Sequence, residues 1–262
     1  MTSVGRCATI EHMFVVTDRP TLQPTFFGLD EPAVDVRFTG SERTWFDEDS
    51  WVEVVPRWLT GADRLFDELA NSLSWQQRTV RMYDRMVVEP RLVWWWQAGS
   101  GSRLPSPFLT DMRMLLSIRY GKIFDSIGAN FYRDGRDSVA WHRDRLGVSG
   151  DAAVSIVSTG APRPFLLRPR GGGVSRAFLV GHGDLLTMGG LANEGWEHSV
   201  PKVAHAGPRI SLVFRHDSDG PRGDVTSDHP SRTRSSRDRY AAAKAQRQAE
   251  HRVWESVSST TT

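Results

Sequence analysis

A histidine and an aspartate two positions apart, His142 and Asp144, are the first residues in this sequence whose types and spacing suit chemistry. In an extended segment the side chains alternate between two faces, so both residues leave the same face and can reach a common point. An imidazole nitrogen and a carboxylate oxygen at one point can bind a metal ion. The pair alone is a weak signal, because a chain with eight histidines and 31 acidic residues contains roughly one such pair by chance.

His198 is the candidate that completes a ligand set. It follows a predicted strand that begins at Asp184 and a turn at Gly189-Gly190, which can bring it opposite His142 and Asp144. Two histidines and one carboxylate are the ligands of non-haem iron(II) sites that leave three coordination positions open. Oxygen chemistry uses these positions, because a chelating cosubstrate takes two of them and dioxygen takes the third.

The segment from Arg209 to Arg215 predicts a strand with two arginines on one face. At a period of two, one face carries Arg209, Ser211 and Arg215, and the opposite face carries Ile210, Leu212 and Phe214. An inward-pointing guanidinium requires an anionic partner, because an unpaired buried charge is costly. A dicarboxylate satisfies it by bidentate pairing, whereas an exposed strand face with solvated charges is the alternative.

Together with an Asn-x-Tyr pair upstream, these residues form the pattern of a known family. The pattern is Asn130-x-Tyr132, His142-x-Asp144, His198 and Arg209-x-Ser211-x-x-x-Arg215. In this order it resembles the AlkB family of iron(II)/2-oxoglutarate-dependent dioxygenases. The resemblance covers about residues 50 to 216. It implies a double-stranded β-helix, or jelly roll, with a nucleotide-recognition lid before the iron-binding strand. It also implies iron(II), 2-oxoglutarate and dioxygen, and an enzyme that oxidatively removes N-alkyl groups from bases in DNA.

The same resemblance implies roles for individual residues. The metal ligands, which are also the catalytic residues, are His142, Asp144 and His198. The 2-oxoglutarate contacts are Asn130, Tyr132, Arg209, Ser211 and Arg215. The lid, at about residues 80 to 108, contributes substrate contacts at Met82, Tyr83, Asp84 and Arg85. Trp141 is a further substrate candidate, with packing as its alternative role. His182, His205 and His216 lack the family's surroundings, and we expect them to be solvated.

Two positions depart from the family pattern. Many members have asparagine where this chain has Ser211, whose hydroxyl can still donate a hydrogen bond. Well-known DNA-repair members carry an acidic residue two positions after the ligand aspartate, where it contacts the damaged base, but this chain has Leu146. Leu146 therefore bears on which alkylated substrate the protein accepts.

The elements that must position these residues are helices in the first half of the chain and strands in the second. Apolar residues recur at helical spacing from Trp51 to Leu73, and Thr60 is the expected N-cap of a helix from Gly61 to about Leu73. A second helical face runs from Leu109 to Tyr120, after a loop rich in Gly, Ser and Pro. Short strands are expected within 81–92 and at 153–158, 164–167, 177–180, 184–188 and 210–214. This order predicts a mainly β protein with flanking helices (α+β).

The chain divides into an N-terminal extension (1–50), a dioxygenase domain (51–216) and a polar tail (217–262) with a helix at about 235–257. From Ser231 to Arg252 the tail holds seven Arg or Lys against Asp238 and Glu250. This excess fits an electrostatic arm for nucleic acid, and it also fits a plain polar tail.

Composition narrows the classes of protein to consider. Hydrophobic residues make up 39% of the chain and charged residues 24%, as in a globular enzyme. The one cysteine, Cys7, excludes an internal disulfide and a thiolate metal cluster. The sequence has no apolar run of ~20 residues and no signal-peptide segment, so we expect a cytoplasmic monomer without membrane contact. The net charge of +2 neither supports nor excludes nucleic acid as a partner.

Three functions are open at this point. The first is a dealkylase for damaged DNA, with bases such as 1-methyladenine and 3-methylcytosine. The second is an oxygenase of the same fold that acts on RNA, a protein side chain or a small metabolite, which Leu146 and the balanced charge favour. The third is a catalytically silent protein that binds nucleic acid.

Overall fold

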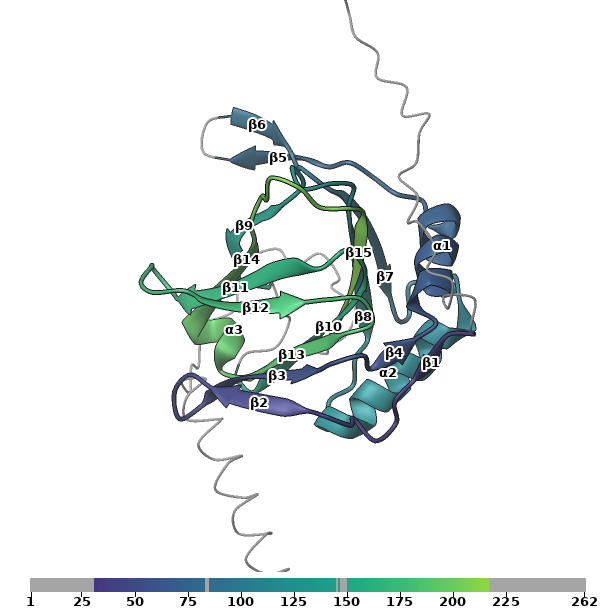
Figure 1. The fold of residues 1–262 in the computed structure, drawn as a ribbon, viewed down its shortest axis with the longest axis horizontal. Coiled ribbons are helices and arrows are strands. Elements are labelled where there is room, and N and C mark those ends of the chain that lie inside the picture. Colours follow the sequence, from purple (N-terminus) through teal and green to yellow (C-terminus); the bar gives the residue numbers. More distant parts are fainter. Residues whose placement is uncertain (1–30, 83–84, 145, 147–149, 217–262) are drawn as a thin grey trace, which may run out of the picture.

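Two antiparallel sheets that pack face to face form the centre of the protein, seen here in a computed structural model (Figure 1). The structure describes residues 31–82, 85–144, 146 and 150–216. Residues 1–30 of the predicted extension lie outside the described residues, as does the tail with its predicted helix and basic arm.

Eight consecutive strands form a double-stranded β-helix, which confirms the predicted jelly roll. They are β8 (Ser126–Tyr132), β9 (Val139–His142), β10 (Ala152–Gly160), β11 (Arg163–Pro169), β12 (Arg176–Val180), β13 (Leu185–Gly190), β14 (Trp196–Val200) and β15 (Arg209–Arg215). A large sheet contains β8, β10, β13 and β15, and a small sheet contains β9, β11, β12 and β14. The chain therefore crosses between the sheets repeatedly, and residues far apart in sequence become neighbours.

Further strands widen the large sheet. β2 (Glu42–Trp45) and β3 (Ser50–Val55) extend one edge beyond β13, and β7 (Leu92–Gln97) extends the other beyond β8. Two small ladders stand apart: β1 (Ala33–Val34) pairs with β4 (Leu59–Thr60), and β5 (Thr79–Met82) pairs with β6 (Arg85–Val88). Within the predicted lid, the β5–β6 hairpin is thus a separate ladder, whereas β7 is part of the large sheet.

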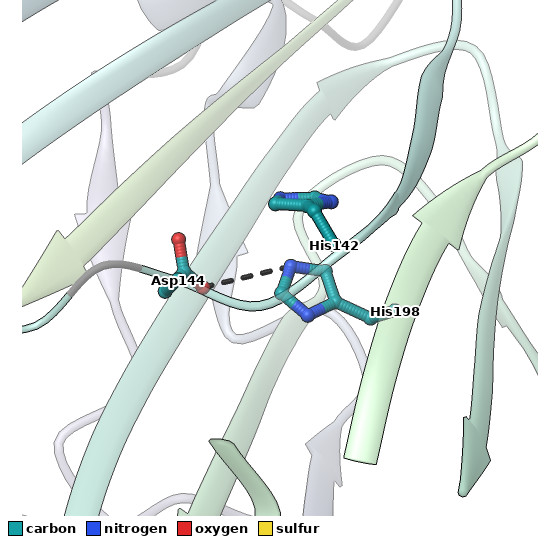
Figure 2. A group of neighbouring side chains, drawn as sticks. All are labelled: His142, Asp144 and His198. Atoms are coloured by element: carbon teal, nitrogen blue, oxygen red, sulfur yellow. Dashed lines mark ion pairs between the residues drawn. The ribbon is translucent and has the colours of Figure 1, made fainter. Parts of the chain in front are cut away.

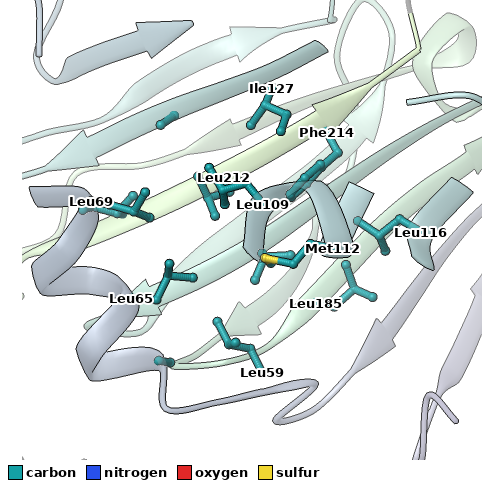
Figure 3. Packing of buried hydrophobic residues seen from close by; sticks show 14 of the residues in the cluster. Leu59, Leu65, Leu69, Leu109, Met112, Leu116, Ile127, Leu185, Leu212 and Phe214 are labelled. Carbon is teal, nitrogen blue, oxygen red and sulfur yellow. The ribbon is translucent and has the colours of Figure 1, made fainter. Parts of the chain in front are cut away.

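Two helices, α1 (Ala62–Ser72) and α2 (Pro107–Tyr120), cover the outer face of the large sheet. Leu69 of α1 and Met112 of α2 are fully buried there with Leu212 and Phe214 of β15 (Figure 3). Burying each such side chain stabilises the fold by about 1.5–3 kcal/mol. Val213 belongs to a second core between the two sheets. The alternation predicted for β15 is therefore confirmed.

The region before α1 differs from the prediction. Ser50–Val55 forms β3 rather than a helical face, because it is enclosed between β2 and β13 and most of it is buried. Thr60 is not the N-cap of α1, since it ends β4 and its hydroxyl donates to the Ala33 carbonyl at 3.2 Å. Gly61 takes the capping position with a φ of 62°, which glycine adopts without strain.

The other helices also depart from the predicted pattern. α2 begins at Pro107, two residues before the predicted start, because proline is well accommodated in the first turn of a helix. A short helix, α3 (Ala192–Gly195), joins β13 to β14, so helices are not confined to the first half of the chain. Among the described residues, none of the helices has the length and apolar character of a membrane span.

Candidate active site

Three side chains with metal-ligating atoms converge at the β9 edge of the small sheet (Figure 2). His142 is the last residue of β9, and His198 on β14 is its partner across the ladder. Asp144 follows β9 by two positions. One nitrogen from each imidazole and one oxygen of Asp144 lie within 4.8 Å of one another. Antiparallel pairing of two distant strands thus brings the predicted triad together.

Each imidazole is held in a defined orientation. The Ala140 carbonyl lies 2.9 Å from Nδ1 of His142, and because a carbonyl only accepts, Nδ1 is the donor in this contact and Nε2 is the ring nitrogen left for another ligand. The His198 ring stacks on Phe165 at a centroid distance of 5.2 Å and lies 4.2 Å from the His142 ring. Packing therefore limits the rotation of both ligand candidates.

The carboxylate of Asp144 has one satisfied oxygen and one open oxygen. Arg215 holds Oδ1 through Nε at 2.8 Å and Nη2 at 2.7 Å. The second oxygen, Oδ2, is buried without a hydrogen-bond partner among the described residues. Nε2 of His198 lies 3.5 Å from Oδ2, too far for a good hydrogen bond. A buried anionic oxygen without a donor favours a cation at this point.

Electrostatics keep Asp144 and His198 in the protonation states that a metal requires. Burial disfavours the ionised carboxylate, but the Arg215 guanidinium outweighs it, and the pKa of Asp144 falls to about 2. Burial also lowers the pKa of His198 to about 3, and His142 acts in the same direction. At neutral pH the site presents an ionised carboxylate and a neutral His198 imidazole, as metal binding needs.

At the start of β15 lies a buried arginine, Arg209, that has no acidic partner within the described ranges. Arg209 is 1% exposed, and its Nη2 donates to the Ser158 hydroxyl at 2.7 Å. Its Nε and Nη1 have no hydrogen-bond partner among the described residues, and burial lowers the pKa of the guanidinium. The Tyr132 ring lies 5.1 Å from it, and Tyr132 is also its partner across the β15–β8 ladder. Two free donors at a buried cation favour an anionic ligand.

The same face of the large sheet carries the remaining predicted 2-oxoglutarate contacts. Ser211 is the ladder partner of Asn130 on one side and of Ser158 on the other. The side-chain oxygen of Asn130 accepts a hydrogen bond from Nε of Arg91 at 2.9 Å. The fold thus gathers five predicted contacts on two adjacent strands, Asn130, Tyr132, Arg209, Ser211 and Arg215. Their assignment to 2-oxoglutarate stays a prediction.

Comparison with known proteins now decides the family. A family model described as the 2OG-Fe(II) oxygenase superfamily matches residues 52–215, from β3 to the end of β15. Alpha-ketoglutarate-dependent dioxygenase alkB homolog 3 of Rattus norvegicus is 32% identical over 197 residues, which cover 66% of this chain and 67% of that protein.

The chain belongs to the AlkB family of 2OG-Fe(II) oxygenases. Other relatives agree. The alkB homolog 3 of Bos taurus is 34% identical over 63% of this chain and 65% of its own length. DNA oxidative demethylase ALKBH2 of Arabidopsis thaliana is 29% identical over 57% of this chain and 60% of its own length. The chain spans about two thirds of the length of these relatives, and the family prediction is confirmed.

Membership in this family implies iron(II) and 2-oxoglutarate as cofactors, as predicted, and the residues present fit both. The triad offers two imidazole nitrogens and the open Oδ2 of Asp144, which is the donor set that iron(II) prefers at sites with vacant positions. The free donors of Arg209 match a carboxylate of a dicarboxylic acid. Among the described residues, iron(II) would thus meet the unpaired Oδ2 of Asp144, and 2-oxoglutarate would meet the unpaired Nε and Nη1 of Arg209.

Three residues that position the site were missed by reasoning from the sequence. Arg91 holds Asn130, Ser158 holds Arg209, and Asn193 of α3 binds the main chain of Asp144. Ser158 lies within a predicted strand, but its contact depends on the β10–β15 register. The sequence carries no signal for Arg91 or Asn193, because both contacts join segments that only the fold brings together.

The predicted substrate contacts are placed less completely. Tyr83 and Asp84 lie outside the described residues, while Met82 and Arg85 are the backbone pair nearest the tip of the β5–β6 hairpin. Trp141 is not brought to the triad. It precedes His142 in β9 and so points to the opposite face, where the Arg168 guanidinium lies 4.2 Å from its ring. Packing, the alternative role considered for Trp141, fits this position.

Three further histidines were considered as metal ligands, His182, His205 and His216, and two of them have structural contacts. His205 is exposed, as predicted. His216 is buried and accepts a hydrogen bond from the Ala153 amide at 2.9 Å, so the prediction that it is solvated is wrong. His182 accepts from the Gly160 amide at 2.8 Å and pairs with Asp63 at 3.2 Å, so it too is more than a solvated side chain. The fold recruits both to satisfy backbone amides.

Proposed function

We propose that this protein is an iron(II)/2-oxoglutarate-dependent dioxygenase that removes alkyl groups from nitrogen atoms of nucleic-acid bases, with damaged DNA as its substrate. The observation that carries the proposal is the pairing of an open metal-ligand triad with a buried arginine that has two free donors. When bound, iron(II) would let dioxygen act as the oxidant: one oxygen atom would go to 2-oxoglutarate, which becomes succinate and carbon dioxide, and the other would hydroxylate the N-alkyl carbon, whose C–N bond then breaks to release an aldehyde and the unmodified base.

The residues of the chain contribute binding, orientation and charge. His142, His198 and Asp144 would hold the metal, each through one ligand atom. Arg215 keeps Asp144 ionised and fixes Oδ1, which leaves Oδ2 as the oxygen that could bind the metal. Arg209 binds one carboxylate of 2-oxoglutarate, and Ser158 holds the guanidinium in place for this role. The protein thereby fixes which coordination positions are filled by side chains and which are left for cosubstrates.

An exposed indole beside Arg215, the residue that holds Asp144, supports a planar base as the substrate. Trp95 is 49% exposed, whereas Trp94 and Trp96 pack against the core beneath the helices. The Arg215 guanidinium lies 5.3 Å from the Trp95 ring. Gly128 is the ladder partner of Trp95. A Cβ at this position would come within 2.9 Å of Arg215 and 3.2 Å of Trp95, so only glycine permits Arg215 and Trp95 to pack this closely over it. Aromatic faces of this kind bind bases by stacking.

Leu146 favours a second candidate, an oxygenase of the same fold with another substrate, such as RNA, a protein side chain or a small metabolite. Leu146 is partly buried against the core between the sheets. A side chain in that position offers no hydrogen bond to a base. Discrimination between substrates then falls to other residues of the site.

The test is mass spectrometry of single-stranded and double-stranded DNA oligonucleotides that carry 1-methyladenine or 3-methylcytosine. The oligonucleotides are incubated with the protein, iron(II), ascorbate and 2-oxoglutarate. We expect loss of the methyl group with the wild type and with Arg136→Ala, an exposed surface change, and no loss with His142→Ala. Turnover of 2-oxoglutarate that leaves every methylated DNA intact would overturn the DNA substrate and favour the second candidate.

A further inference from the structure

The chain leaves the small sheet just before Asp144. β9 ends at His142, where pairing with His198 is the last ladder contact on that side. Asp144 lies two residues beyond this point, and no strand in the described part of the chain supplies hydrogen bonds to its main chain. A ligand at the end of a strand needs another support, because rotation of its backbone would move its carboxylate away from the two imidazoles.

The side chain of Asn193 supplies the missing bonds. The Asp144 amide donates to Oδ1 of Asn193 at 2.9 Å, and Nδ2 of Asn193 donates to the Asp144 carbonyl at 2.9 Å. One donor and one acceptor on a planar amide reproduce what a neighbouring peptide unit of a strand would offer. Asn193 therefore continues the ladder by one residue, to the residue that carries the carboxylate.

The next residue of α3 anchors the same segment at its far end. The carboxylate of Glu194 accepts a hydrogen bond from the Gly150 amide at 2.5 Å. α3 itself is fixed in the fold, because Ala192 is buried in the core between the sheets and the Leu191 amide donates to the Asp49 carbonyl at 2.8 Å. Two consecutive side chains of one helix thus hold Asp144 and Gly150.

We propose that Asn193 is the positioning residue of the Asp144 carboxylate, and that it sets the metal affinity of the site without touching the metal. The inference rests on the proposed function, since it takes the triad to be a metal site. The Asp144 carboxylate is then held at two levels: Arg215 fixes Oδ1, and Asn193 fixes the backbone from which the carboxylate extends. Supports of this kind around metal ligands typically change metal affinity about 10- to 100-fold when removed.

The test is a titration of the full-length protein with cobalt(II) in the absence of substrate. The visible absorption of the bound ion reports how much cobalt(II) is bound at each point. We expect Asn193→Ala to bind cobalt(II) about tenfold or more weakly than the wild type. Asn193→Ser puts a hydroxyl in place of the amide and can restore at most one of the two hydrogen bonds, so we expect a smaller loss of cobalt(II) affinity than in Asn193→Ala. Asn71→Ala is the matched control. Asn71 on α1 also donates to a main-chain carbonyl, that of Asp67 at 2.8 Å, but lies outside the site. The cobalt(II) affinity of this variant should stay within twofold of the wild-type value.

Thermal unfolding of each metal-free variant separates positioning from folding. A variant that is folded at the titration temperature and still binds weakly supports the proposal. Wild-type affinity in both Asn193 variants would overturn the inference alone and leave the metal site intact. If the metal site is correct, the wild type binds one equivalent of cobalt(II) and His142→Ala loses this binding. A wild type that binds no cobalt(II) would overturn the metal site and the inference together.

Discussion

Replacement of Arg215 by methionine tests how the protein keeps a carboxylate ionised inside its core. The side chains of Asp144 and Arg215 are 4% and 14% exposed, and two guanidinium nitrogens hold the same oxygen. Removing one partner of a buried ion pair costs about 3–5 kcal/mol. Two hydrogen bonds to a charged group, at about 1.5–3 kcal/mol each, give about 3–6 kcal/mol, which overlaps this range. We therefore expect Arg215→Met to lower the free energy of unfolding of the metal-free protein by about 3–5 kcal/mol.

Metal and pH should each reduce this loss. Manganese(II), a stable substitute for iron(II), would neutralise the carboxylate that Arg215 no longer pairs. In the wild type the pKa of Asp144, about 2, lies below its ordinary value of 3.8, so the ion pair stabilises the fold above pH 3.8 and this stabilisation is lost as the pH falls towards 2. In the variant the contribution of Arg215 is gone, so burial raises the pKa of Asp144 relative to the wild type; protonation then relieves the buried charge, and the difference in unfolding free energy between the two proteins shrinks in acid.

Urea unfolding of both proteins, with and without manganese(II), at pH 7 and pH 5, measures each quantity. Arg136→Met is the control, because Arg136 and Asp134 form an exposed pair with 88% and 37% of their side chains accessible, and such pairs contribute about 0–1 kcal/mol. The reasoning fails if metal-free Arg215→Met is within 1 kcal/mol of the wild type. It also fails if neither manganese(II) nor lower pH narrows the difference.

Three further predictions follow from single side chains. Arg209→Met should weaken 2-oxoglutarate binding about 100-fold in an equilibrium binding assay, because charged hydrogen bonds of about 1.5–3 kcal/mol each are lost. The free energy of unfolding in urea should stay the same or rise, because an incompletely paired buried charge is removed. Trp95→Ala should raise KM for a methylated oligonucleotide by the equivalent of about 1–3 kcal/mol and leave cobalt(II) affinity unchanged, so equal KM values would contradict stacking. Gly189→Ala should destabilise the fold by about 3 kcal/mol or more on thermal unfolding, since its Cβ would lie 1.9 Å from the Trp51 ring.

Local patterns in the sequence were sufficient for those parts of the site that depend on spacing along one strand. The alternation from Arg209 to Arg215 survives in the structure because a strand places every second side chain on one face. Asp144 lies beyond the end of β9 and is held near His142 by Asn193 and Arg215 rather than by strand periodicity. Reasoning from spacing was wrong for Ser50–Val55, which was predicted to be part of a helical face but forms strand β3. A strand buried between two others shows no alternation of polar and apolar residues that distinguishes it from a helix.

Capping also required information beyond local spacing. Threonine before an apolar helix is a good N-cap by type, but β4 takes Thr60 into a ladder with β1, and Gly61 adopts the left-handed conformation that begins α1. Which residue ends a strand and which begins a helix was decided by the pairing partner. That partner lies 27 positions earlier in the chain, where Ala33 accepts the Thr60 hydroxyl.

The sequence by itself predicted the candidate metal ligands and their order from imidazole and carboxylate chemistry, and it indicated the family by resemblance, because these patterns lie in short segments. Only the tertiary structure decided what holds those ligands. Asn193 meets Asp144 across 49 positions, and Arg215 meets it across 71. Contacts at such separations arise from the crossing of strands between two sheets, so they follow from the register of the jelly roll rather than from any pattern around the residues themselves.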